Sequence, residues 1–304
     1  MTTATATAAT TGGAAVPRSP RRLTPARIVL HVFLAVIALA WLFPVGWAVL
    51  NSFRDYNYTS SHGYVSLGGW TLHNYVDAWQ RADFTKHFLN SVYVTVPAVV
   101  LTLFLSSCMA FVLARFSFAL NLPLLALFTA ANLLPQQSLL IPLFRLYRAI
   151  GLPDWMSDSG TLLNSYWGLI LVNTAFQTGF CTFVLSNYMK TLPRELYEAA
   201  MVDGASIWRQ YWQVTMPLCR PPLAALATLE VTWIYNEFFW ATVLVQSGDK
   251  FPVTSSLNNL RGEFFTDLNL VAAGSVVVAA PTLVVFFALQ RHFVAGLTLG
   301  ANKG

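Results

Sequence analysis

Charged residues are scarce in this chain: Asp, Glu, Lys and Arg make up 10% of its 304 residues, whereas a soluble domain carries about 25%. The sequence also lacks Gly-x-Ser-x-Gly, His-Glu-x-x-His and the phosphate-binding string Gly-x-x-x-x-Gly-Lys-Ser/Thr. Its 3 cysteines and 5 histidines are scattered, without the spacing of a disulfide framework or a metal site. We therefore expect no cofactor, no metal, no catalytic residues and no ATP hydrolysis by this chain. The scattered basic residues exclude a nucleic-acid face.

Long hydrophobic runs dominate instead: 56% of the residues are hydrophobic and the mean hydropathy is +0.54. A hydrocarbon core of ~30 Å takes about 20 helical residues to cross. Runs of that length lie at 28–50, 88–113, 122–144, 166–187, 219–245 and 270–290. Because a backbone in lipid must satisfy its own hydrogen bonds, each run predicts a helix. The fold class predicted is an all-α integral membrane protein with six transmembrane helices within residues 27–304.

Basic residues predict the orientation in the membrane. Residues 1–26 are Thr/Ala-rich and then Pro/Arg-rich, which predicts a disordered cytoplasmic tail before an uncleaved first span. With that tail inside, the inner segments hold most of the 18 basic residues, namely Arg18, Arg21, Arg22, Arg27, Arg115, Lys190, Arg194, Arg209, Arg220, Arg291 and Lys303. Both termini are then cytoplasmic in a multi-pass plasma-membrane protein. The longest outer segment, 51–87, carries Trp70, Tyr75 and Trp79 and suits an interfacial stretch, with contact to an extracellular partner as the alternative.

A polar, helix-forming segment lies between the fourth and fifth hydrophobic runs, in the loop 188–218. Pro193 suits the first position of a helix, and Glu195 and Glu198 suit the positive end of its dipole. Gly204 fits a helix end with positive φ, and Ser206 can cap a second short helix over 207–213. These features predict a helix–turn–helix elbow. A surface hairpin that merely joins two spans is the alternative.

The segment reads Glu198-Ala199-Ala200, then Gly204, then Val214-x-Met216-Pro217. It resembles the cytoplasmic EAA loop of binding-protein-dependent ABC importers, with Val214 and Met216 in place of the family's Ile and Leu. Asp203-Gly204-Ala205-Ser206 is similar to the form typical of carbohydrate importers. Similar stretches recur in order at 89–95, 114–116, 134–143 and 290–298. Over residues 25–304 the chain resembles the shorter permease subunit of maltose-type sugar importers.

The resemblance implies a type I permease fold and a subunit that forms half of a translocation pathway by alternating access. It implies these partners: two separate ABC ATPase subunits, a second homologous permease that completes a heterodimer, an extracytoplasmic sugar-binding protein, membrane lipid and a small-molecule sugar. The chain itself would be a transport subunit and not an enzyme. The residues it implies for ATPase coupling are Glu195, Glu198, Ala199, Ala200, Asp203, Gly204, Ala205 and Pro217.

Polar residues inside membrane spans are costly and are therefore candidates for function. Glu230, Trp233, Glu237 and Trp240 follow one helical stripe of the fifth run, with Asn236 beside it. Carboxylates accept hydrogen bonds from sugar hydroxyls, and indoles stack on sugar rings. Two further pairs put amides on one helix face, Asn132 with Gln136 and Asn173 with Gln177. These residues predict a carbohydrate path, and the amide pairs could instead line the seam between the two permease subunits. Hydrogen bonding between neighbouring helices is the alternative.

Other functions fit less well. A polyol or glycerol phosphate is the nearest competing substrate, but a phosphate should call for Arg or Lys in the spans, and the apolar cores contain neither. A multispanning membrane enzyme would need a cluster of acids or histidines at one membrane face. A secondary transporter would usually show internal repeats and more spans.

Overall fold

The computed structural model describes residues 25–262 and 266–298, and side chains as far as residue 288. These residues are almost entirely helical, with isolated β-bridges at Arg54–Trp70 and Gly151–Thr161. They belong to two compact units, Met1–Trp47 and Ala48–Gly304. The first contains most of α1, Pro25–Ser52, a 28-residue apolar helix long enough to cross a membrane. The predicted first span is confirmed. Of the predicted tail, residues 1–24 lie outside the described residues.

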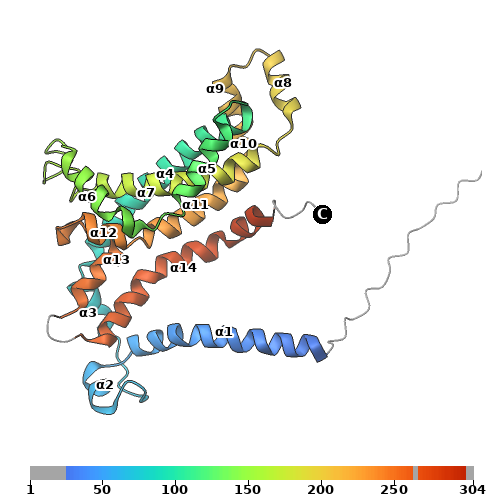
Figure 1. The fold of residues 1–304 in the computed structure, drawn as a ribbon. Coiled ribbons are helices and arrows are strands. Elements are labelled where there is room, and N and C mark those ends of the chain that lie inside the picture. Colours follow the sequence, from blue (N-terminus) through green and yellow to red (C-terminus); the bar gives the residue numbers. More distant parts are fainter. Residues whose placement is uncertain (1–24, 263–265, 299–304) are drawn as a thin grey trace, which may run out of the picture. The chain divides into compact units, whose positions relative to one another are not determined.

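The second unit is built on α4 (Phe84–Arg115), α7 (Tyr166–Met189), α11 (Arg220–Tyr235) and α14 (Leu268–Thr298). α4 lies along α7, and α11 packs against α4, α7 and α14 (Figure 1). Small buried residues on the first two helices, among them Ala98, Ala110, Ser106 and Cys181, allow close approach. The predicted spans 88–113, 166–187 and 270–290 fall within these helices.

The predicted span 122–144 is sharply broken. α5 (Asn121–Ala131) meets the helical segment Gln136–Ala149 at 97°. That segment consists of η1 (Gln136–Leu139) and α6 (Leu140–Ala149), and it follows Pro135, whose backbone is extended. Because a proline cannot continue the hydrogen bonds of a helix, the chain changes direction fully at Pro135.

The prediction of one continuous helix over 219–245 is wrong. α11 ends at Tyr235, and a separate helix, α12 (Phe239–Leu244), follows after a short break. The Glu237 carboxylate accepts the backbone N–H groups of Trp240 and Ala241, at 2.6 and 3.1 Å, and so starts the new helix. Within the described ranges, four helices are long and apolar enough to span a membrane, or five if the bent pair counts as one span.

One end of the second unit is a folded cap of short helices: α2 (Tyr56–His62), α3 (His73–Arg81), η3 (Gly248–Lys250), α13 (Val253–Ser256) and η4 (Leu257–Leu260). Arg54 is fully buried there, and its guanidinium donates to Asn51, Ser66 and the carbonyls of Tyr64 and Gly68. The predicted outer segment 51–87 is thus held by internal polar bonds. Trp70 remains 63% exposed.

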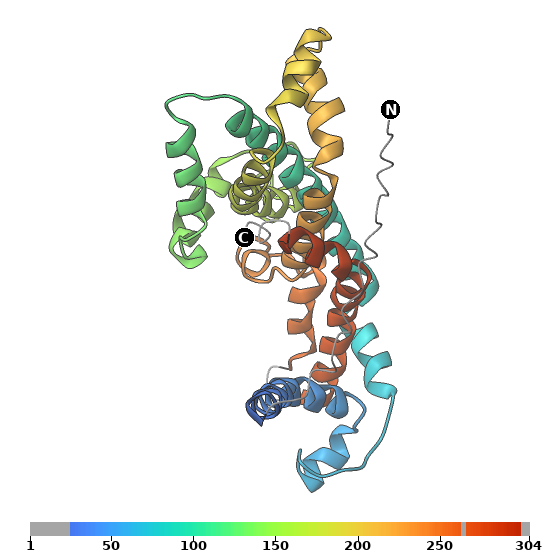
Figure 2. The ribbon, with the colours of Figure 1, turned by 90° about the vertical axis from the view of Figure 1, so that its right-hand side faces the viewer.

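The opposite end carries the elbow, in which α8 (Arg194–Val202) is followed by α9 (Ile207–Arg209), the π-helix η2 (Gln210–Thr215) and α10 (Met216–Leu218). α8 and α9 project beyond the α4–α7–α11 bundle in both views (Figures 1 and 2). The predicted second helix, 207–213, is therefore longer and runs on to Leu218 before α11 begins.

Candidate functional site

A polar chamber of about 570 Å³ lies where the α5–η1 and α11–α12 breaks face α7. Eight of the nine residues expected on a substrate path line it: Asn132, Gln136, Asn173, Gln177, Trp233, Asn236, Glu237 and Trp240. Its other lining residues are phenylalanines, Phe176, Phe180, Phe238 and Phe239. The chamber therefore gathers side chains from both helix breaks and from α7.

The chamber's asparagines are oriented by their own helices. Asn132, Asn173 and Asn236 donate through Nδ2 to the carbonyl four residues earlier, at 2.8–2.9 Å. This bonding leaves the amide oxygens available as acceptors. The side-chain amides of Gln136 and Gln177 form no hydrogen bond with any described residue. Together these amides offer both donors and acceptors, and no Lys or Arg occurs among the described lining residues.

Aromatic rings form the rest of the chamber wall. Phe176 stacks on Trp240, with centroids 5.5 Å apart, and Phe180 meets Trp233 edge-on at 5.4 Å. Trp240 is only 1% exposed, whereas Trp233 is 44% exposed. Of the two indoles expected to stack on a sugar ring, Trp233 presents the larger free surface, and Trp240 mainly supports the wall.

The expected stripe of two carboxylates is not formed, because the helix that would carry it ends at Tyr235. Glu237 lines the chamber, but its carboxylate oxygens are bonded to the α12 backbone. Glu230 lies outside the chamber, fully buried, with Oε1 accepting from Cys181 Sγ at 3.1 Å. Glu230 therefore joins α7 to α11, and the free polar groups of the chamber are amides.

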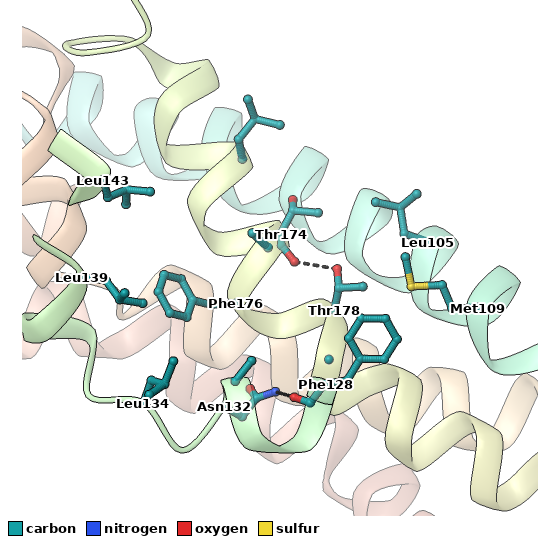
Figure 3. Close-up of a pocket in the computed structure, with 14 residues that line it drawn as sticks. Leu105, Met109, Phe128, Asn132, Leu134, Leu139, Leu143, Thr174, Phe176 and Thr178 are labelled. Atoms are coloured by element: carbon teal, nitrogen blue, oxygen red, sulfur yellow. Dashed lines mark hydrogen bonds between the residues drawn. The ribbon is translucent and has the colours of Figure 1, made fainter. Parts of the chain in front are cut away.

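A second cavity, of about 560 Å³, adjoins the chamber and shares Asn132 and Phe176 with it (Figure 3). Its wall is otherwise mostly apolar, including Leu105, Met109, Phe128, Leu139 and Leu143. Thr174 and Thr178 both donate to carbonyls one turn earlier on α7. With its hydroxyls already bonded, this cavity offers little to a hydroxylated ligand, and we assign the candidate path to the polar chamber.

The elbow turns at Gly204. Its φ of +73° is the left-handed conformation expected at this position, and no atom lies near its missing side chain. The Ala205 N–H closes the turn onto the Ala200 carbonyl at 2.9 Å. Ser206 caps the second helix by accepting from the Arg209 N–H, as predicted. Pro193 precedes α8 as its cap, one position earlier than expected.

Residues expected to contact an ATPase lie mostly on the surface of the elbow. Glu195, Glu198, Ala199, Asp203, Gly204 and Pro217 are exposed, and Ala200 and Ala205 are half-buried. Beside them lie exposed apolar side chains that sequence reasoning missed, Val202 at 88%, Ile207 at 56% and Trp208 at 61%. Large apolar residues within a polar loop were the available signal. An apolar patch of this kind is typical of a protein-binding surface.

Comparison with known proteins shows the family. Residues 81–298 match the family described as binding-protein-dependent transport system inner membrane component, and the chain belongs to it. It is thus a membrane-embedded permease of an ABC transporter, a transport component and not an enzyme.

The chain is 31% identical to a probable ABC transporter permease of Pyrococcus horikoshii, over 86% of this chain and 92% of that one. It is also 31% identical to the diacetylchitobiose uptake permease NgcG of Streptomyces coelicolor, over 90% and 88% of the two chains. The fold matches a bacterial ABC transporter involved in alginate import, with a TM-score of 0.74 at 23% identity, covering 91% of this chain and all of the other.

Proposed function

We propose that this chain is a permease subunit of an ATP-driven importer of neutral carbohydrates and that its polar chamber lies on the sugar's path. The observation that carries the proposal is the convergence of amides and aromatic rings from three separate parts of the chain on one chamber. Amides bond to sugar hydroxyls, and aromatic faces pack on the apolar faces of the rings. Relatives named for diacetylchitobiose, α-glucosides and melibiose, raffinose and stachyose support a carbohydrate substrate.

An uncharged sugar suits the chamber better than an acidic or phosphorylated one. No cationic side chain occurs among its described lining residues, and an anion removed from water requires a charged partner or several hydrogen-bond donors. This composition also disfavours glycerol phosphate. Alginate, named for the similar solved structure, is an acidic polysaccharide, so a likeness of fold does not extend to that substrate.

The elbow supports coupling to a separate ATPase. We place α8 and α9 in the cytoplasm together with both termini, because most basic residues then lie inside. Two ATPase subunits would dock on this elbow and on that of a sister permease. Closure of the ATPases would draw the elbows together and open the chamber outward to sugar delivered by a binding protein. ATP hydrolysis would then reset it. The segment 51–87 of the cap would face outward, toward the membrane interface or the binding protein.

Uptake in the native host tests the substrate class. After deletion of this gene, uptake of labelled neutral oligosaccharides should fall and return with a plasmid copy, while uptake of uronate oligomers and glycerol phosphate stays unchanged. Loss of uronate or glycerol phosphate uptake alone would contradict a neutral sugar. Unchanged uptake across a broad panel of neutral sugars would contradict a carbohydrate importer.

A further inference from the structure

A hydrogen bond joins the elbow to the membrane bundle. Tyr211 of η2 is 2% exposed, and its hydroxyl lies 2.7 Å from Ser107 Oγ of α4. Ser107 uses its own proton to bond the Phe104 carbonyl at 2.8 Å. With the Ser107 proton used in this way, the Tyr211 hydroxyl donates to Ser107 and accepts from the Cys108 thiol at 3.5 Å. A hydrogen bond buried at a helix contact holds the two helices in one register.

On its other side, Tyr211 contacts the exposed part of the elbow. Trp208 stacks on the Tyr211 ring with centroids 5.5 Å apart and planes at 27°, and Trp208 itself is 61% exposed. Tyr211 also packs edge-on against Phe111 of α4, at 5.4 Å. A partner that displaces the Trp208 indole would thus also displace the Tyr211 ring, which is hydrogen-bonded to α4.

The π-helix sets the direction of the Tyr211 side chain. An extra residue in a helical turn re-aims the side chains within it, and such insertions recur at functional sites. Here Thr215 Oγ1 bonds the Gln210 carbonyl at 3.3 Å and lies 3.1 Å from the Tyr197 hydroxyl of α8. Both ends of η2 are therefore held, and α8 moves with it.

A second buried bond continues the connection to the chamber. Ser106, next to Ser107 on α4, donates to the Thr178 carbonyl of α7 at 3.1 Å. Thr178 directly follows Gln177, whose side chain lines the chamber. A shift of α4 at Ser107 would pass to the neighbouring Ser106, across its hydrogen bond to Thr178, and so to Gln177 in the chamber wall.

We propose that Tyr211 is a positioning residue that transmits movement of the elbow to α4 and, through Ser106 and Thr178, to the chamber wall. The inference rests on the proposed docking of an ATPase on the elbow. A chain of contacts alone does not demonstrate energetic coupling, so its test must measure coupling directly. The quantity to measure is the amount of sugar imported per ATP hydrolysed.

The experiment uses the whole importer, purified with its ATPase, sister permease and binding protein and reconstituted in proteoliposomes. With Tyr211→Phe, the ATPase stays bound and hydrolysis continues, but sugar per ATP falls by about fivefold or more, the lower range of coupling between sites. Ser107→Ala has the same effect. The double variant is no worse than either single variant, because both remove one shared bond.

Tyr188→Phe is the matched control. It removes a phenol hydroxyl that bonds the Leu218 carbonyl at 3.1 Å, at the base of the same loop. Its sugar-to-ATP ratio should stay at the wild-type value. An unchanged ratio for Tyr211→Phe, additive losses in the double variant, or an equal loss for Tyr188→Phe would overturn the transmission role. Loss of the ATPase from the Tyr211→Phe complex would also overturn it, since Tyr211 would then hold the docking surface. A wild-type complex without an ATPase would contradict the proposed function itself.

Discussion

The chamber's free glutamine amides are its most direct candidates for binding a sugar. We expect Gln177→Ala to raise the apparent KM for the sugar by about fivefold with its amount in the membrane unchanged, because a lost hydrogen bond costs about 1 kcal/mol. Gln246→Ala, at an exposed position outside the chamber, should leave KM unchanged. Sugar uptake measured as a function of concentration decides the matter. Equal KM values for wild type and Gln177→Ala would remove Gln177 from the path.

Glu237 should act through α12 and not through the substrate. Glu237→Ala removes both carboxylate oxygens that accept backbone N–H groups at the start of α12 and should lower the free energy of unfolding by about 1 kcal/mol, the usual cost of a lost helix cap. Glu237→Gln keeps one acceptor oxygen and should cost less. Thermal unfolding in detergent, followed by tryptophan fluorescence, measures both. A variant of unchanged stability but altered sugar preference would make Glu237 a ligand after all.

Sequence patterns predicted which residues line the chamber better than they predicted how the helices arrange those residues. Asn132 with Gln136 and Asn173 with Gln177 have the spacing of one helical turn, and all four line the chamber. The first pair does not share a helix face, because the helix breaks between them. Within α8, Tyr197 is buried whereas Met201 is 51% exposed.

At the scale of elements, the elbow offers a test that separates charge from backbone strain. Gly204→Asp and Gly204→Asn both impose a side chain on a positive φ, which costs most residues about 1–2 kcal/mol. Only Asp adds a charge beside the apolar patch of the elbow. We expect uptake to be lost with Gly204→Asp and largely kept with Gly204→Asn, with membrane insertion normal in both.

A matched control lies at the other end of the unit. Gly63 ends α2 with φ +84°, ψ 156° and equally open surroundings, a backbone conformation that is almost restricted to glycine. Gly63→Asp therefore imposes backbone strain and the same added charge away from the elbow. It should leave uptake intact. Normal uptake by Gly204→Asp, or equal losses from Asp at both positions, would contradict docking of a partner at Gly204.

The cap carries a pH-dependent ion pair between Lys86 and Asp249. The Lys86 hydrogen bond, at 2.5 Å, lowers the pKa of Asp249 below its ordinary value. Because the pKa of Asp249 is lower in the folded protein than in the unfolded chain, the ion pair stabilises the fold above about pH 4, the ordinary range of Asp. That stabilisation is lost as the pH falls through the lowered pKa. Asp249→Asn should therefore reduce Tm by a similar small amount at pH 8 and pH 5, and the difference from wild type should shrink as the pH falls below about 4. A difference that grows on acidification would contradict this sign.

The breaks between elements were predictable only in part. Pro135 indicates the break between α5 and η1, because proline cannot continue the hydrogen bonds of a helix. Nothing comparable marks the break after Tyr235, where Asn236, Glu237 and Phe238 are neither proline nor glycine. There a side chain bonds to the backbone ahead of it, and local propensity does not reveal whether such a bond wins over helix continuation. Both breaks matter because the chamber lies between them.

For the whole molecule, hydropathy predicted where membrane helices lie, and the elbow motif predicted the family that the comparison confirmed. Composition could not indicate which faces meet a partner. The polar chamber emerges only when distant segments are folded together. The family match establishes the permease class, while the partner subunits and the substrate remain the proposals to be tested.

The most direct test of the central claim, that this permease is coupled through its elbow to a separate ATPase, is purification of the tagged chain from its own host in mild detergent, with mass spectrometry of what accompanies it. The account predicts an ABC ATPase and a second permease in the wild-type sample, and loss of the ATPase alone with Gly204→Asp. Recovery of a stable chain without an ATPase, or an ATPase that stays bound in that variant, would contradict it.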